Sequence, residues 1–445
     1  MRRVSTPVAD PDLFPDTARI GADGHLGVGG CDVVALAASY GTPLYVYDEA
    51  SIRARARAYR ETLARAYPGR STVCYAAKAY CAPWLLRLIA DEGLGLDVVS
   101  GGELHAALSV GFPAERAYFH GNNKSADELR LAVAAGVGRV VIDNLDEAAR
   151  LAGLARERGA RQAVLLRVGP GVSAHTHAHL QTGAADTKFG LDIASGAAAT
   201  GVREILARPE LELRGLHMHI GSQIGETEAY REGVARLMGF AAEMRAAAGL
   251  ALREVSPGGG FAVRYAPDET RVDAARLIGE VARVLLAAAR EHGFTDPLPD
   301  LTIEPGRALV ATSAVALYRV GSVKRTGTRT YAAVDGGMAD NIRPTAYDAR
   351  YTAVVADRMR DAADTPVTVA GRYCESGDIL VREARLPAPR VGDLLAVPVS
   401  GAYHLALASN YNQVPRPAVV VVAHGVPRLV RRRETYDDLL ALESD

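Results

Sequence analysis

Short apolar runs alternate with longer amphipathic stretches between residues 43 and 304. The short runs are rich in β-branched residues and predict buried strands, whereas the longer stretches predict helices. The predicted strands are Thr72–Ala77, Gly95–Val99, Ala117–His120, Arg139–Asn144, Ala163–Val168, Leu213–Ile220, Glu254–Ser256 and Asp300–Glu304. Strands that alternate with helices pair in parallel through right-handed crossovers. The pattern therefore predicts an α/β protein with a (β/α)₈ barrel.

A doubly wound open sheet is the alternative architecture. Such a sheet usually carries a GxGxxG turn after its first strand. Here the corresponding place, after Thr72–Ala77, holds Lys78. This difference favours the barrel.

The pattern changes after Arg307, where short β-branched runs follow one another with glycine and proline turns between them. The runs are Val310–Val323, Thr330–Val334, Val367–Ala370, Leu394–Pro398 and Ala418–Val422. They predict an all-β domain. We expect the Gly- and Pro-rich residues 1–47 to help complete it, since they end in the apolar run Pro43–Tyr47. The predicted parts are an N-terminal segment (1–47), a barrel (48–306) and a C-terminal β domain (307–445).

Composition narrows the possible partners. The 445 residues carry a formal net charge of −1 and are 49% hydrophobic and 23% charged, which indicates neither a nucleic-acid nor a membrane-surface partner. No apolar run approaches the roughly 18 residues of a membrane span, and the polar N-terminus lacks the apolar segment of a signal peptide. The four cysteines show no CxxC spacing, which predicts reduced thiols and a cytoplasmic protein.

Polar groups at the strand ends are the candidate catalytic residues, because barrel enzymes place their chemistry at the carboxyl ends of strands. These groups are Lys78, Asp97, His120, Asp143, Arg167, His219, Gly258–Gly260 and Glu304. A lysine at the end of a buried strand is costly to desolvate, so we expect a lowered pKa and an amine that can form a Schiff base. The alternative is a lysine whose stem is buried and whose ammonium reaches solvent.

Three further features indicate a phosphorylated aromatic cofactor. The run SPGGGF, Ser256–Phe261, could cradle a phosphate with backbone N–H groups, or could be only a tight turn. Arg307 could bind the same phosphate or a substrate carboxylate. Glu304 could hold a heterocyclic nitrogen protonated, or could form a structural ion pair. Together with Lys78 these features describe pyridoxal phosphate.

Histidines offer a rival interpretation. His217 and His219 are spaced by two, which predicts that they point to the same face of one strand. They could stack on a cofactor, fill the core, or join the loop residues His175, His177 and His179 in a metal-dependent hydrolase. We expect no metal, because a hydrolase site has no need of the glycine run.

A series of motifs covers nearly the whole chain beyond residue 25 and resembles the diaminopimelate decarboxylases. That family belongs to the fold-type III, alanine-racemase-like group of pyridoxal-phosphate enzymes. The motifs are YAAKA around Lys78, HGNNKS (His120–Ser125), TKFG (Thr187–Gly190), GLHMHIGSQ (Gly215–Gln223), GGGF, EPGR, DGGMADNIRPTAY (Asp335–Tyr347), CESGD (Cys374–Asp378) and SNYNQVPRP (Ser409–Pro417).

The resemblance implies decarboxylation of meso-2,6-diaminopimelate to L-lysine and CO₂, the last step of lysine biosynthesis, by a homodimer with shared active sites. It implies that Lys78 forms the Schiff base, that His219 stacks on the ring, that Glu304 pairs with the ring nitrogen, and that Cys374 of the other subunit reprotonates the product. The implied cofactor contacts are Ser222, Gly258, Gly259, Gly260, Gly306, Arg307 and Tyr411. The implied substrate contacts are Arg307, Arg343, Tyr347, Glu375 and Tyr411.

The chain departs from the family pattern at His404 and Leu405, and at Arg372 and Tyr373. The first departure precedes Tyr411 and bears on the fit of the substrate. A related decarboxylase acting on ornithine, lysine, carboxynorspermidine or a carrier-tethered amino acid is the alternative function. A non-catalytic pyridoxal-phosphate carrier is another, although such carriers generally lack a β domain.

Overall fold

The structure, a computed structural model, describes residues 6–172 and 188–444. It divides into two compact units. The barrel unit comprises Arg55–Ala262 and Val272–Ala308, and the sheet unit comprises Met1–Ala54, Val263–Arg271 and Leu309–Asp445. Two helices, α2 (Glu49–Ala66) and α10 (Arg307–Val310), contain residues of both units.

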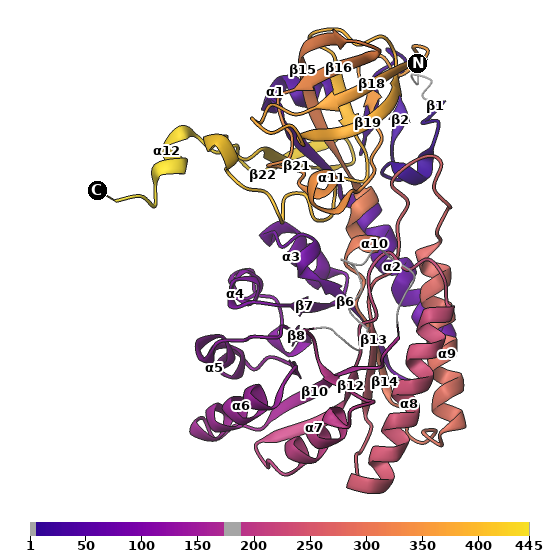
Figure 1. The fold of residues 1–445 in the computed structure, drawn as a ribbon, viewed down its shortest axis with the longest axis vertical. Helices are drawn as coiled ribbons and strands as arrows, with labels where there is room; N and C mark the ends of the chain where they lie inside the picture. Colours follow the sequence, from indigo (N-terminus) through magenta and orange to yellow (C-terminus); the bar gives the residue numbers. More distant parts are fainter. Residues whose placement is uncertain (1–5, 173–187, 445) are drawn as a thin grey trace. The chain divides into compact units, whose positions relative to one another are not determined.

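A closed ring of parallel strands forms the centre of the barrel unit (Figure 1). Its strands are β6 (Ser71–Ala76), β7 (Gly95–Val98), β8 (Ala117–Phe119), β9 (Arg139–Ile142), β10 (Gln162–Gly169), β12 (Leu211–His217), β13 (Glu254–Gly258) and β14 (Asp300–Ile303). Neighbours in this order pair in parallel, and β14 pairs with β6 to close the ring. The predicted (β/α)₈ barrel is confirmed. A short strand, β11 (Leu191–Asp192), adds to β10 outside the ring.

A helix follows each of the first seven barrel strands. These helices are α3 (Pro83–Asp91), α4 (Gly101–Ser109), α5 (Ala126–Ala135), α6 (Leu145–Glu157), α7 (Ala197–Leu206), α8 (Glu228–Ala248) and α9 (Ala274–Glu291). Polar residues after the strands start several of them: Ser100, Ser125 and Asn144 each accept a hydrogen bond from a backbone N–H in the first turn. Such caps satisfy N–H groups that have no partner within the helix, so they set where each strand-to-helix turn ends.

The interior of the barrel is filled by side chains from different strands. Cys74, Tyr118, Val141 and Leu165 come from four strands and pack into one buried cluster. Every residue of β7, β8 and β13 is buried, as expected for parallel strands covered on both faces. The ring is therefore a packed core, which leaves the strand ends for chemistry.

One long strand, β15 (Ala314–Thr326), organises the sheet unit. It pairs antiparallel with β5 (Leu44–Asp48), β16 (Arg329–Val334) and β20 (Leu394–Val397). β5 also pairs in parallel with β21 (Ala418–Ala423), so the prediction that the N-terminal segment helps complete this fold is confirmed. The same sheet contains β17 (Val354–Val355), β18 (Thr365–Ala370), β19 (Ile379–Leu386) and β22 (Val426–Arg431).

The rest of the sheet unit consists of short elements. A small antiparallel sheet contains β1 (Thr6–Pro7), β2 (Arg19–Ile20), β3 (Leu26–Val28) and β4 (Cys31–Asp32). The helices are α1 (Val33–Tyr40), α11 (Arg343–Tyr347) and α12 (Tyr436–Leu440). Neither the small sheet nor α11 is predicted by the hydrophobic pattern.

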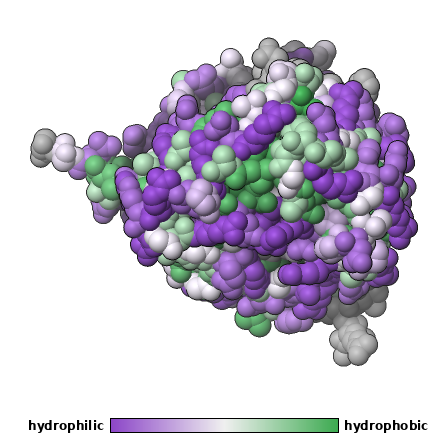
Figure 2. All heavy atoms as spheres, turned by 90° about the horizontal axis from the view of Figure 1, so that it is seen from below, coloured by the Kyte–Doolittle hydropathy of each residue, from purple (hydrophilic) through white to green (hydrophobic). Residues whose placement is uncertain are grey.

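Across the described residues, no helix combines the length and the hydropathy that crossing a membrane requires. On the face that Figure 2 shows, hydrophilic residues predominate, and apolar residues form smaller areas between them.

Candidate active site

Lys78 lies in a 3₁₀ turn, Ala77–Ala79, directly after β6. This turn packs closely against the end of β14. The N–H of Ala76 donates to the carbonyl of Pro305, and a Cβ on Gly306 would lie 3.0 Å from the Cβ of Ala76. Because only small residues line this contact, the two strand ends can approach each other. Lys78 therefore lies at the carboxyl end of β6, as the sequence predicts.

The exposure of Lys78 differs from the expected burial. The strand that carries it is buried, but Lys78 lies beyond the last strand position and is exposed. Its charge acts on Asp97, which is buried at the end of β7. Burial raises the pKa of Asp97 to about 8, while the positive charge of Lys78 acts to lower it. The lysine therefore stands beside an acidic group rather than in an apolar pocket.

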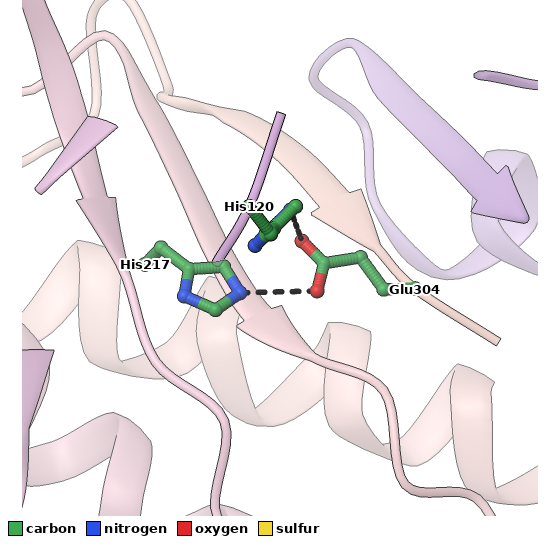
Figure 3. A group of neighbouring side chains, drawn as sticks. All are labelled: His120, His217 and Glu304. Atoms are coloured by element: carbon green, nitrogen blue, oxygen red, sulfur yellow. Dashed lines mark hydrogen bonds and ion pairs between the residues drawn. The ribbon is translucent and has the colours of Figure 1, made fainter. Parts of the chain in front are cut away.

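Glu304 follows β14, and the side chains of His217 and His120 point toward its carboxylate (Figure 3). Its Oε2 lies 3.0 Å from Nε2 of His217, and its Oε1 accepts a hydrogen bond of 2.9 Å from the hydroxyl of Ser256. Nε2 of His120 lies 3.5 Å from the same Oε1. Burial alone would raise the pKa of Glu304, but these neighbours hold it below its ordinary value. Glu304 is therefore a buried, ionised carboxylate held in place by the barrel.

His217 and His219 do not share partners, because β12 ends at His217. His217 turns to Glu304, whereas Nδ1 of His219 accepts a 3.2 Å hydrogen bond from the N–H of Gly259. Burial and the charges of Lys78 and Arg167 hold the pKa of His219 well below its ordinary value. The His219 ring is therefore neutral, and its proton is on Nε2 because Nδ1 is an acceptor.

The glycine run at the end of β13 allows three strand ends to meet. A Cβ on Gly259 would lie 1.9 Å from the carbonyl oxygen of Glu304. Gly260 has a φ of +95°, and its Cβ would lie 2.2 Å from the carbonyl oxygen of Gly221. The N–H of Gly258 donates to Ser256, and that of Gly259 donates to His219. The run is therefore a structural close approach, in which two of the three N–H groups expected to cradle a phosphate are already bonded within the protein.

Arg307 and Ser222 form the clearest anion-binding pair in the barrel unit. Nη2 of Arg307 donates to the hydroxyl of Ser222 at 3.1 Å, and Arg307 is buried. Ser222 follows Gly221, whose carbonyl lies against Gly260. A guanidinium and a hydroxyl next to bare backbone provide donors suited to a phosphate. The predicted residues Ser222, Gly260 and Arg307 are thus brought together.

Arg343, on α11 in the sheet unit, is a buried cation with aromatic neighbours. Its Nη1 donates to the hydroxyl of Tyr351, and its guanidinium lies 4.7 Å from the ring centre of Tyr265 and 5.6 Å from that of Tyr351. Among the described carboxylates, none forms an ion pair with Arg343. Burial alone would lower the pKa of Arg343, but these tyrosines raise it above its ordinary value.

The other predicted residues of the sheet unit lie on loops and at a helix end. The backbone N–H of Cys374 donates to the side chain of Asn412 at 3.0 Å, and the hydroxyl of Tyr411 donates to Glu375. Cys374, Glu375 and Tyr411 are exposed and are brought together by these contacts. Tyr347, also exposed, ends α11.

Some residues of these sites are missed by the sequence analysis. Asp378 accepts hydrogen bonds from the N–H groups of Met338 and Tyr373, and so holds the loop that carries Cys374. Its place in the motif CESGD is the one available signal. His120, noted only as a strand end, proves to be a neighbour of Glu304.

The histidine pair expected in the metal alternative is not the pair that meets. His120, His217 and Glu304 bring ligand atoms within 4.8 Å of one another, and His219 is not among them. His175, His177 and His179 lie outside the described residues.

Comparisons with known proteins assign the family. Residues 49–311 match the family described as pyridoxal-dependent decarboxylase, pyridoxal binding domain. The chain is 44% identical over 428 residues to diaminopimelate decarboxylase of Bacillus subtilis (strain 168). This match covers 96% of this chain and 97% of the relative. It is 47% identical over 439 residues to the diaminopimelate decarboxylase of Actinosynnema pretiosum subsp. auranticum. This match covers 98% of this chain and 96% of the relative.

A solved structure agrees with these sequences. The crystal structure of diaminopimelate decarboxylase from M. jannaschii in co-complex with L-lysine matches with a TM-score of 0.90 and 33% identity, over 97% of this chain and 99% of that one. The expected cofactor, pyridoxal phosphate, is confirmed by these relationships, which favour it over metal-dependent hydrolysis. The chain belongs to the diaminopimelate decarboxylases, a family of pyridoxal-dependent decarboxylases.

Proposed function

We propose that this protein decarboxylates meso-2,6-diaminopimelate to L-lysine and CO₂. Its family membership supports the reaction. The structural observation that carries the choice of substrate is Arg343, a buried cation whose described contacts are a phenol hydroxyl and two aromatic rings. A buried guanidinium is strongly stabilised by a carboxylate that binds it through two hydrogen bonds. Arg343 therefore selects a substrate that keeps a carboxylate at its far end.

Diaminopimelate has such a carboxylate, because it carries two amino-carboxylate groups and loses only one. Lysine or ornithine, reacting at its amino-carboxylate end, would present only an ammonium at the far end. We assign the far carboxylate to Arg343 and the far ammonium to Glu375, with Tyr347 and Tyr411 as further substrate contacts. Arg307 remains a second candidate for the carboxylate, but its bond to Ser222 supports a role at the cofactor phosphate.

The barrel residues fit the cofactor. Bound pyridoxal phosphate supplies an electron sink for the carbon that loses its carboxylate. Lys78 binds the cofactor through its amine. Glu304, ionised and buried, holds a proton at the ring nitrogen, because a neighbouring anion favours the protonated form. The neutral ring of His219 packs on the cofactor ring.

Phosphate binding falls to residues near the end of β13. Ser222 and Arg307 provide donors. We include Gly258, Gly259, Gly260 and Gly306 by family resemblance, since the three glycines after Pro257 and Gly306 lie where strand ends approach each other closely. We include Tyr411 in this set by family resemblance.

Cys374 is our candidate for the acid that returns a proton to the substrate carbon. It is exposed on the sheet unit, next to Glu375. We propose a homodimer in which these residues and Tyr411 of one copy complete the site of the other. We also propose a cytoplasmic location, which the four free cysteines support.

The test is CO₂ release from a panel of substrates by the purified protein reconstituted with pyridoxal phosphate. The panel contains meso-diaminopimelate, L-lysine and L-ornithine at equal concentrations. We expect release from meso-diaminopimelate to exceed the others by at least about 100-fold, since a site built for a charged partner rejects an analogue that lacks it. Faster release from L-ornithine or L-lysine would establish the alternative decarboxylase and overturn this proposal.

A further inference from the structure

A chain of hydrogen bonds runs through the sheet unit behind Arg343. The hydroxyl of Tyr351, which accepts from Arg343, lies 2.9 Å from Nε2 of His404. Nδ1 of His404 lies 3.1 Å from the hydroxyl of Tyr45. That hydroxyl in turn donates to Asp340, at 3.2 Å to Oδ2 and 3.0 Å to the backbone carbonyl. The guanidinium is thus connected to a buried carboxylate through two phenols and one imidazole.

The hydrogens in this chain have one consistent direction. Since Tyr45 gives its only hydroxyl hydrogen to Asp340, Nδ1–H of His404 must donate to the oxygen of Tyr45. Nε2 of His404 then accepts from the hydroxyl of Tyr351, whose oxygen accepts from Arg343. An imidazole suits this place because it accepts on one side of the ring and donates on the other.

Packing fixes the same groups. His404 is 1% exposed and Tyr351 is 6% exposed. The Tyr351 ring meets His404 edge-on at 5.2 Å and Tyr265 edge-on at 5.0 Å. The Tyr351 hydroxyl therefore has little freedom, and it is the hydrogen-bond acceptor that directs the side chain of Arg343.

His404 lies in the segment GAYHLALASNYN, which leads to Tyr411. A histidine buried in a sheet unit, bonded on both ring nitrogens, is not explained by the roles already assigned. Its second bonded neighbour, Tyr351, leads directly to the residue that selects the substrate.

We propose that His404 is a positioning residue that holds Tyr351, and through it Arg343, in the orientation that binds the far carboxylate of the substrate. This inference rests on the proposed function. His404 itself does not touch the substrate. It determines how well the substrate binds and leaves the chemical step alone.

The test compares steady-state kinetics of the reconstituted enzyme on meso-diaminopimelate. His404→Phe keeps the ring and removes both hydrogen bonds. We expect KM to rise about tenfold, the usual effect of weakening one hydrogen bond to a charged group, with kcat within twofold of the parent enzyme. His404→Gln, which keeps a polar group near Tyr351, should recover part of the affinity.

Two further variants separate positioning from packing. Tyr351→Phe should raise KM at least as much as His404→Phe, and the double variant should be no worse than Tyr351→Phe alone, because both changes break one chain of contacts. Leu405→Val, at the neighbouring buried position, changes packing without removing a hydrogen bond and should leave KM unchanged. Tyr351→Phe also provides the test if His404→Phe does not fold.

A binding measurement adds a second readout. L-Lysine keeps the amino-carboxylate that Arg343 would hold, whereas cadaverine lacks the carboxylate. His404→Phe should weaken inhibition by L-lysine and leave inhibition by cadaverine unchanged. Unchanged KM in His404→Phe and Tyr351→Phe, additive effects in the double variant, or an equal rise of KM in Leu405→Val would overturn the proposal. A parent enzyme that does not act on meso-diaminopimelate would instead refute the proposed function.

Discussion

Two buried charges, one in each unit, are satisfied in different ways. Glu304 in the barrel unit and Arg343 in the sheet unit are each 6% exposed. Glu304 is bonded by His217 and Ser256 and has His120 beside it, so its oxygens already have polar partners within the protein. Arg343 meets a hydroxyl and two rings, which do not neutralise a cation. The difference indicates that the barrel prepares the cofactor site in advance, while the sheet unit leaves a charge for the substrate to complete.

The largest expected effect concerns the cofactor site in the barrel unit. Lys78→Ala should abolish CO₂ release and the visible absorbance band of the bound cofactor, because the amine that anchors the cofactor is lost. Absorbance spectra after reconstitution and gel filtration measure this. A band of normal intensity in the variant would show that another residue is the anchor.

Glu304→Gln tests whether the buried carboxylate of Glu304 takes part in the chemistry. The amide keeps the size of the side chain but cannot hold a proton at the ring nitrogen, so kcat should fall by about 100-fold with the cofactor still bound. Ser256→Ala removes one neighbour of the same carboxylate and serves as the milder comparison. A Glu304→Gln enzyme with normal kcat would reduce Glu304 to a structural role.

Gly260→Ala tests the close approach of strand ends at the cofactor site. The new Cβ would collide with the carbonyl of Gly221 at 2.2 Å, so we expect affinity for pyridoxal phosphate to fall at least tenfold. Gly392→Ala is the matched control, since Gly392 has a similar φ of +94° with nothing within 4 Å of its Cβ. Equal losses in both variants would assign the effect to backbone strain alone.

The smallest effect concerns Asp97, whose pKa is raised to about 8, chiefly by burial. An unfolded aspartate ionises near pH 4, so between pH 4 and pH 8 the folded state binds more protons and Asp97 lowers stability as pH rises. In the cofactor-free protein, Asp97→Asn should therefore raise the melting temperature at pH 8 by about 2 °C and have less effect at pH 4. A larger gain at pH 4 would contradict the sign of this shift.

The barrel could be predicted from sequence because its strands are short, continuous apolar runs. The observed β6, β7 and β14 agree with the predicted strands within one residue at each end. The prediction extends β12 three residues too far, to Ile220, and so places His217 and His219 on one face. Apolar side chains continue beyond the strand at Met218 and Ile220, which remain buried, so hydrophobicity alone does not mark the end of pairing. β19 was missed because its burial pattern is irregular around Glu383, which has a positive φ.

The candidate site residues could also be predicted only in part from the sequence. Strand ends indicate Lys78 and Glu304 as candidates, since each follows an apolar run. The neighbours of Glu304 come from β12, from β13 and from the residue after β8, and they depend on closure of the ring. Arg343 and Cys374 were found only through family resemblance, and the link from Arg343 to His404 joins segments far apart in the chain. No local pattern encodes such contacts.

The most direct test of the two-charge account is the kinetics of Arg343→Ala on meso-diaminopimelate, with Arg343→Lys for comparison. We predict that KM rises at least 100-fold in Arg343→Ala, as expected when a buried charge pair loses one member, while the cofactor band stays intact. Arg343→Lys should recover part of this loss, because lysine restores the charge without the paired hydrogen bonds. A KM near that of the parent enzyme in Arg343→Ala would show that the substrate carboxylate binds elsewhere.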